Sequence, residues 1–267
     1  MAVRILGPPP QLKRKHKQSM AAVDSDLNSD PEEVAKFEAL ASRWWDTEGE
    51  FKPLHDINPV RLDYIAQRLD LAHADVIEVG CGGGILTDAL ADRGAKVTGI
   101  DMAPGPLTVA KLHALESGNT VNYQQITAEE QRDKTPHAFD LVACLEVLEH
   151  VPDVGSTVQA CADLARPGAP LVFATINRTP QAYALAILGA EYIMNILPRG
   201  THDWERFIKP SELARHCRNA GLEVKDISGM KYNPFTRAAG LTRNTSVNYI
   251  MHAQKPNQKP NQKPKKT

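Results

Sequence analysis

A run of glycines lies between an apolar strand pattern and the helix pattern that follows it. The sequence there is Glu78-Val79-Gly80-Cys81-Gly82-Gly83-Gly84. Glycines at such a turn let a ligand approach the backbone closely. They can also adopt backbone conformations that other residues avoid. Asp101 ends the next strand pattern, where a carboxylate can accept hydrogen bonds from a ribose. Strand, glycine loop, helix, strand and acid in this order predict a site for a cofactor that carries a ribose.

Three side chains able to bind a proton or a metal ion follow the fourth strand pattern. Glu146, Glu149 and His150 stand at i, i+3 and i+4, which is one face if this stretch is helical. Two carboxylates and an imidazole can hold a hard divalent cation such as Mg²⁺. Alternatively, His150 alone is a general base, since imidazole titrates near neutral pH. His202 in Gly200-Thr201-His202-Asp203 is a second candidate base.

The charges are unevenly distributed along the chain. The 267 residues include 31 Lys and Arg and 32 Asp and Glu, but residues 1–19 and 254–267 each carry five bases and no acid. The body between them is therefore acidic. This argues against a nucleic-acid-binding domain, which needs basic charge on its surface, and favours a cationic small molecule as ligand.

Cysteine usage and apolar runs indicate the compartment. The four cysteines show no CxxC pair and no zinc spacing, which is typical of reduced thiols in a cytosol-like compartment. The chain has no uninterrupted apolar stretch of about eighteen residues, so no transmembrane helix is predicted. We therefore expect a cytoplasmic protein. Residues 1–29 are predicted to be a disordered leader, and the Lys/Pro-rich residues 254–267 a disordered tail.

The remaining residues, 30–253, alternate between strand and helix patterns. Asp30-Pro31-Glu32-Glu33 is a typical helix start. A second helix is expected over 60–69, after a turn at Asn58-Pro59, and a further one over 107–116. Short apolar strands then alternate with helices, which predicts parallel βαβ units, and strands at 222–227 and 247–253 can close the sheet as an antiparallel hairpin. The predicted fold is α/β and Rossmann-like: a mostly parallel, doubly wound sheet with a closing antiparallel hairpin and an N-terminal helical extension.

The glycine loop discriminates between two cofactor classes. The dinucleotide-binding fingerprint has glycine or alanine at the position where this chain has Ile85. In addition, the carboxylate of Glu78 ahead of the glycines would repel a pyrophosphate. A nicotinamide oxidoreductase is therefore the less favoured alternative. The acid-x-Gly-x-Gly-x-Gly pattern resembles the signature of class I S-adenosylmethionine-dependent methyltransferases. A catalytically silent, methyltransferase-like scaffold is a further alternative.

Further motifs lie outside the glycine loop. They are Phe37-Glu38-Ala39, Ser42-Arg43-Trp44-Trp45-Asp46, Gly49-Glu50-Phe51-Lys52-Pro53-Leu54-His55, Asn58-Pro59-x-Arg61, Glu146-x-x-Glu149-His150, Gly200-Thr201-His202-Asp203 and Tyr232-Asn233-Pro234. With these motifs, about residues 30–253 resemble one family, the O-methyltransferases of ubiquinone biosynthesis. That resemblance implies S-adenosylmethionine as co-substrate and methylation of a 2-polyprenyl-6-hydroxyphenol and of 3-demethylubiquinol. Glu78, where aspartate is usual, Pro104-Gly105-Pro106 and both tails depart from the family pattern.

The resemblance also implies the cofactor-binding residues. Arg61 would reach the methionine carboxylate, Gly80 and Gly82 would form the loop, and Asp101 would hold the ribose. Leu145 would line the site after the fourth strand. For Arg61 a surface ion pair remains an alternative, and for Leu145 a plain core position.

Residues 178–210 interrupt the sheet pattern where a short connection would suffice. The stretch 182–197 is nearly all apolar and has basic flanks, yet sixteen helical residues cover only ~24 Å of a ~30 Å hydrocarbon core. The segment is predicted to be either a buried lid or an interfacial helix. In the second case the protein binds the anionic inner face of the cytoplasmic membrane peripherally, where its polyprenyl substrate and other ubiquinone-biosynthesis enzymes would lie.

Replacing Ile187 and Ile193 with glutamate tests the interfacial helix. The double variant should no longer bind liposomes, because each large apolar side chain contributes about 1.5–3 kcal/mol of binding free energy when it is fully buried. Its turnover should fall more on long-tailed substrates than on soluble catechols. Co-sedimentation and turnover assays measure both effects. A double variant that still co-sediments and treats both substrates alike would identify the segment as an internal lid.

Overall fold

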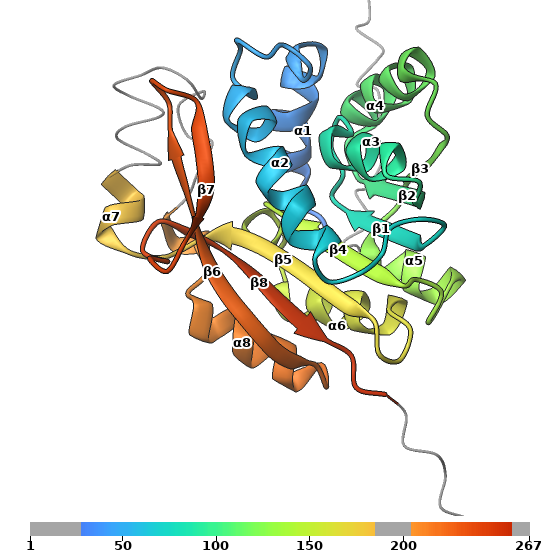
Figure 1. Cartoon of the computed structure of the whole chain (residues 1–267), viewed down its shortest axis with the longest axis vertical. Helices are drawn as coiled ribbons and strands as arrows, with labels where there is room; N and C mark the ends of the chain where they lie inside the picture. Colours follow the sequence, from blue (N-terminus) through green and yellow to red (C-terminus); the bar gives the residue numbers. More distant parts are fainter. Residues whose placement is uncertain (1–27, 185–203, 258–267) are drawn as a thin grey trace, which may run out of the picture.

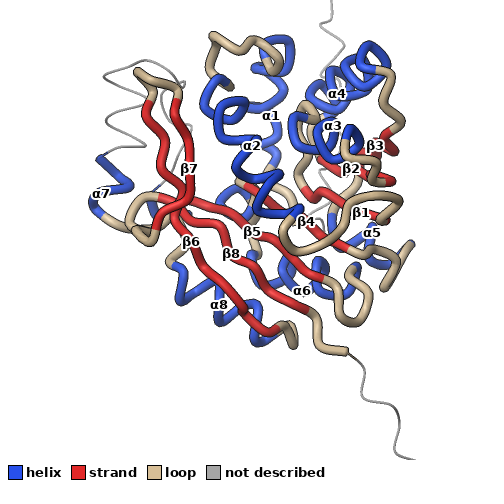
Figure 2. Tube along the Cα trace, viewed as in Figure 1, coloured by secondary structure: helices blue, strands red, loops and turns tan. Residues whose placement is uncertain are grey.

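Eight strands form one sheet through the molecule (Figures 1 and 2), in the order β3-β2-β1-β4-β5-β8-β6-β7. The computed structural model describes residues 28–184 and 204–257 of the chain. The strands are β1 (Asp75–Val79), β2 (Lys96–Asp101), β3 (Val121–Gln125), β4 (Leu141–Leu145), β5 (Pro170–Ile176), β6 (Glu223–Asn233), β7 (Ala238–Thr242) and β8 (Asn248–Gln254).

Strands β1 to β5 are parallel, as the alternating pattern predicts. From β1 the chain winds outward through β2 to β3 and then returns to the other side of β1 as β4. The strand order therefore reverses between β1 and β4. In open α/β sheets, ligands bind outside the carboxyl ends of the strands at such a reversal.

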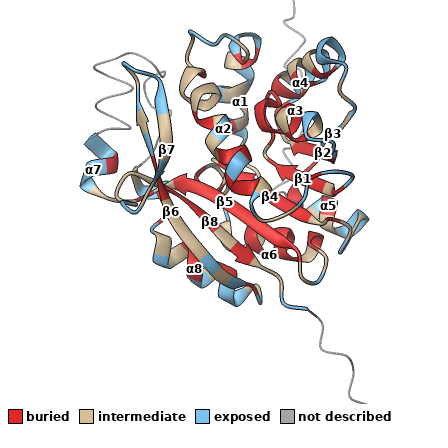
Figure 3. Ribbon diagram, in the orientation of Figure 1, coloured by how far each residue is buried: buried red, intermediate tan, exposed pale blue. Residues whose placement is uncertain are grey.

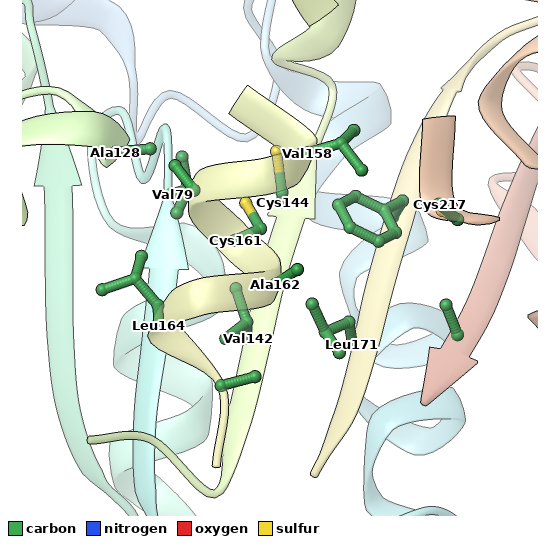
Figure 4. Packing of buried hydrophobic residues seen from close by; sticks show 14 of the residues in the cluster. Val79, Ala128, Val142, Cys144, Val158, Cys161, Ala162, Leu164, Leu171 and Cys217 are labelled. Atoms are coloured by element: carbon green, nitrogen blue, oxygen red, sulfur yellow. The ribbon is translucent and has the colours of Figure 1, made fainter. Parts of the chain in front are cut away.

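Helices cover both faces of the sheet, so the central strands are almost wholly buried (Figure 3). Helices α2 (Lys52–Ala66) and α3 (Ile85–Asp92) pack on one face. Helices α6 (Val154–Leu164) and α8 (Pro210–Asn219) pack on the other, where Val158, Cys161 and Cys217 meet the apolar side chains of the strands (Figure 4). The other helices are α1 (Pro31–Leu40), η1 (Ala41–Arg43), α4 (Pro104–Ser117), α5 (Ala128–Lys134), η2 (Leu148–His150), α7 (Pro180–Ala182) and η4 (Trp204–Arg206).

The antiparallel end of the sheet differs from the prediction. The two predicted strands do pair, as β6 and β8, but they are not consecutive. Strand β8 lies between β5 and β6 and is antiparallel to both, while β6 forms its hairpin with β7. The residues of β7, Ala-Ala-Gly-Leu-Thr, lack the alternation of apolar and polar residues that marks a half-buried strand, so no pattern predicts it.

Prolines account for two further differences in helix boundaries. The predicted helix 60–69 begins earlier, at Lys52, and passes through Pro59, which the prediction treated as part of a turn. The helix predicted from residue 107 begins at Pro104, since proline without its N–H is well suited to a first helical position. By contrast, α1 begins as predicted: the Asp30 carboxylate accepts the Glu32 N–H at 3.0 Å.

Most of the predicted lid or interfacial segment, including Ile187, Ile193 and His202, lies outside the described residues. Its described ends meet where the rings of Tyr183 and Trp204 stand perpendicular, 5.6 Å apart. Ala182 and Phe207 are buried beside them. Within residues 28–184 and 204–257, no helix has both the length and the apolar character needed to cross a membrane.

Candidate active site

A cavity of about 720 Å³ opens at the carboxyl ends of β1, β2 and β4. The N-terminal helices α1 and α2 close its other side. Every predicted site residue in the described part of the chain lines this cavity: Arg61, Gly80, Gly82, Asp101, Leu145, Glu146, Glu149 and His150. The fold therefore brings together residues that lie far apart in the sequence.

The glycine loop needs glycine for two reasons. Gly80 and Gly82 have φ angles of +71° and +51°, a region that side chains rarely adopt. A Cβ at Gly80 would also lie 2.0 Å from a methyl carbon of Val147. A Cβ at Gly82 would lie 2.2 Å from the ring of Trp44. Even alanine at either position would therefore force the loop or its neighbours to move.

Two tryptophans of the N-terminal block cover this loop. Trp44 is buried over Gly82 and stacks on Phe51, with ring centroids 4.1 Å apart. The indole N–H of Trp45 donates to the carbonyl of Gly83 at 2.8 Å. In the sequence these tryptophans stand out only as a family signature. Their role in the fold is to hold the N-terminal helices against the cofactor loop.

Asp101 holds the loop from the neighbouring strand. One carboxylate oxygen accepts the Gly82 N–H and the other the Ala103 N–H, each at 2.8 Å. Burial raises the pKa of Asp101, although these backbone donors oppose the rise. Each oxygen keeps a lone pair that can accept from a ligand. The ribose contact predicted for Asp101 is compatible with this geometry and stays a prediction.

Arg61 and Glu78 place unsatisfied polar atoms in the cavity wall. Arg61 is 7% exposed and forms an ion pair with Glu146, so its predicted alternative of a surface pair is wrong. Its Nε, and Oε2 of Glu78, are buried and have no hydrogen-bond partner among the described residues. Burial raises the pKa of Glu78 to about 8. An unpaired donor and an unpaired acceptor suit a ligand that carries both a carboxylate and an amino group, such as the methionine end of S-adenosylmethionine.

Glu146, Glu149 and His150 share the cavity but bind different partners. Only residues 148–150 are helical, as a short 3₁₀ turn, and Glu146 lies before it with φ +56°. The helical face considered for these residues is therefore absent. Glu146 pairs with Arg61, while Glu149 accepts the Thr175 hydroxyl at 2.8 Å. Burial, helped by nearby Glu146, raises the pKa of Glu149 to about 7.

His150 is held by a residue that the sequence marks only as part of a helix start. Its Nδ1 lies 2.8 Å from a carboxylate oxygen of Glu33 on α1, and Phe37 packs edge-on against the imidazole. Burial lowers the pKa of His150, but the hydrogen bond to Glu33 and three nearby carboxylates outweigh it and raise the pKa. The same hydrogen bond lowers the pKa of Glu33 to about 2. No spacing in the sequence connects Glu33 to a histidine more than a hundred residues later.

Two of the three side chains predicted to hold a cation already have charged partners. Arg61 pairs with Glu146, and Nδ1 of His150 is hydrogen-bonded to Glu33. Across the described ranges, no group of three His, Cys, Asp or Glu side chains is arranged to hold a metal. The Mg²⁺ site at Glu146, Glu149 and His150 stays a prediction, and we derive no chemical step through it.

Comparisons with known proteins define the class. Residues 55–227 match the family described as "Methyltransferase domain". The fold is similar to that of magnesium protoporphyrin IX methyltransferase from Synechocystis PCC 6803 with bound SAH, with a TM-score of 0.59 and 19% identity over 79% of this chain and 87% of that chain. The fold is that of a class I S-adenosylmethionine-dependent methyltransferase.

Two relatives identify the family. The ubiquinone biosynthesis O-methyltransferase of Saccharophagus degradans is 58% identical over 231 residues, covering 86% of this chain and 98% of that protein. The protein of the same name from Pseudomonas aeruginosa is 57% identical over 228 residues, covering 85% and 98%. The chain belongs to the family of ubiquinone biosynthesis O-methyltransferases, which confirms the resemblance found in the sequence.

Replacing Asp101 with alanine should weaken S-adenosylmethionine binding by about 1–3 kcal/mol, because charge-assisted hydrogen bonds are lost. Asp101→Asn keeps the shape and should show a smaller loss. Isothermal titration calorimetry measures the affinity of both variants. Thermal unfolding shows whether loss of the hydrogen bond from the Gly82 N–H destabilises the fold. Unchanged affinity in a folded Asp101→Ala protein would rule out the ribose contact.

Proposed function

We propose that the chain transfers the methyl group of S-adenosylmethionine to phenolic hydroxyls of polyprenylated ubiquinone precursors. The substrates would be a 2-polyprenyl-6-hydroxyphenol and 3-demethylubiquinol, so that one site serves both O-methylation steps. The observation that carries this proposal is the single cavity in which the glycine loop, the unpaired atoms of Arg61 and Glu78, and the Glu33–His150 pair meet.

The cofactor would bind along the loop between β1 and α3. Arg61 would hold the methionine carboxylate and Glu78 the amino group, which pairs the two orphaned atoms. Gly80 and Gly82 would form the turn of the loop along the ligand, with Val147 and Trp44 packed against them, and Asp101 would hold the ribose. Leu145 is both buried in the core and exposed to the cavity, so it can pack against the ligand without leaving the core.

The acceptor presents an ionisation problem. A phenol with a pKa of about 10 is only ~0.1% ionised at pH 7, a deficit of roughly 4 kcal/mol. His150 can remove the proton because Glu33 fixes its Nδ1, and Nε2 has no hydrogen-bond partner among the described residues. Glu33 would then stabilise the imidazolium that forms. Methyl transfer itself needs an in-line nucleophile held close to the sulfonium, which is a matter of positioning.

For the location, we propose peripheral binding to the inner face of the cytoplasmic membrane. A polyprenyl acceptor partitions into lipid. Tyr183 and Trp204, the described residues on the two sides of most of the segment predicted to contact the membrane, bring their rings together. Other ubiquinone-biosynthesis enzymes that act on the same lipid would be neighbours there.

The direct test of the function is turnover of a short-chain catechol, followed by the formation of S-adenosylhomocysteine. His150→Ala should lower the rate by about 10²–10⁴ while cofactor affinity is unchanged. The same assay after exhaustive chelation tests the metal site. If EDTA abolishes turnover and Mg²⁺ restores it, the metal hypothesis is correct; full activity of His150→Ala would remove the base role.

Glu33→Gln tests the pairing through the pH dependence of the rate. The base must be neutral to accept a proton, so kcat should rise as the pH passes the pKa of His150. Because that pKa is raised above its usual value of about 6.5, the rise should lie above this pH in the native enzyme. The glutamine side chain keeps the shape but removes the charge of the carboxylate, so the rise should move to lower pH. A profile identical to that of the native enzyme would contradict the pairing.

A further inference from the structure

The hairpin of β6 and β7 ends in an unusually exposed aromatic side chain. Phe235 at its tip is 89% exposed, the highest value among the large hydrophobic side chains that the structure describes. The hairpin projects past the sheet, with its tip beside the N-terminal helices (Figure 1). Tyr232-Asn233-Pro234, singled out in the sequence, leads directly into this tip. The cofactor site gives that motif no role.

The tip is held firmly in this exposed position. The side-chain oxygen of Asn233 accepts the N–H groups of Phe235 at 2.9 Å and Thr236 at 3.2 Å. On either side, the Tyr232 hydroxyl and the Arg237 guanidinium both donate to Asp56 of α2, each at 2.8 Å. Exposure of Phe235 is therefore built into the turn and is not a consequence of a loose loop.

The cavity reaches this hairpin. Its wall includes Met230, Tyr232 and Pro234 from the hairpin and Val247 from the connection to β8. Pro234 lines the cavity, and the next residue, Phe235, stands in solvent. An apolar tail that starts at the reacting phenol can follow this wall and leave the protein at the hairpin tip.

The charge of the hairpin is opposite to that of the body. Residues 227–248 contain Lys231, Arg237 and Arg243 and no acid. Lys231 and Arg243 are exposed, while Arg237 is paired with Glu48 and Asp56. Lys231 lies two residue pairs behind the tip end of the ladder, and Arg243 follows its far end. An aromatic tip with exposed cations farther along the same hairpin matches the boundary between acyl chains and anionic headgroups.

We propose that the tip of the β6–β7 hairpin is a lipid-contacting port for the acceptor. Phe235 enters the lipid boundary, Lys231 and Arg243 meet anionic headgroups, and the prenyl tail passes along Tyr232 and Pro234 into the cavity. The port rests on the proposed function, since only an acceptor dissolved in the membrane needs it. It uses other residues than the stretch 182–197, whose contact with the membrane is a prediction from the sequence.

Vesicle binding tests the port with a matched control. Phe235→Asp should weaken co-sedimentation with vesicles of phosphatidylcholine and phosphatidylglycerol in equal parts by about tenfold, the effect of one partly buried aromatic side chain. Leu115→Asp on α4, which is 78% exposed, makes the same kind of change elsewhere and should have no effect. Phe235→Leu should bind nearly as the native protein does. Equal binding by Phe235→Asp and the native protein would overturn the port.

Kinetics separate the port from the proposed function. In the same vesicles, Phe235→Asp should raise KM for a long-chain polyprenyl catechol by about tenfold, following its loss of binding. Its kcat on a soluble short-chain catechol should match that of the native enzyme. An unchanged KM on the long-chain substrate would overturn the port alone, whereas absence of short-chain turnover in the native enzyme would overturn the proposed function. Weakened binding to another ubiquinone-biosynthesis enzyme, with vesicle binding intact, would assign the tip to a protein partner and so reject the port.

Discussion

The left-handed turn of the glycine loop is the constraint on which the rest of the site depends. Gly80 and Gly82 adopt φ angles that other residues avoid, and the space beside them is already filled by Val147 and Trp44. Asp101 fixes the loop from β2 by accepting the Gly82 N–H. The loop thus joins three elements: the strand it leaves, the strand beside it and the N-terminal helices. A change in the turn would disturb all three at once.

Several charged side chains line the same cavity, and their burial favours a ligand of complementary charge. Arg61 is buried and forms an ion pair with the partly buried Glu146, so these two charges compensate each other. Glu78 is different, because burial raises its pKa and leaves one oxygen without a partner among the described residues. A cationic group next to Glu78 would favour its ionised form. A ligand that brings positive charge, such as a sulfonium cofactor bearing an amino group, would therefore suit this position.

The sequence was sufficient for the features that depend on local pattern. The parallel strands, the glycine loop and Asp101 follow from periodicity and spacing, and the capped start of α1 follows from Asp30-Pro31. It could not show contacts that only the tertiary fold creates. Glu33 meets His150, and Trp44 covers Gly82, because α1 and η1 return over the sheet. Strand β7 was missed because the pairing with β6, and not its own residues, makes it a strand.

The Glu33–His150 pair also answers a question of charge balance in the proposed reaction. Methyl transfer turns a sulfonium cation into a neutral thioether, so a cavity built for positive charge would lose its cation at the transition state. If that were all, the acidic walls would stabilise the substrate more than the transition state and slow the reaction. On the proposed mechanism the phenol proton moves to His150 as the methyl group moves to oxygen. The positive charge then stays in the cavity as an imidazolium beside Glu33, so the carboxylates around His150 stabilise the products of the reaction.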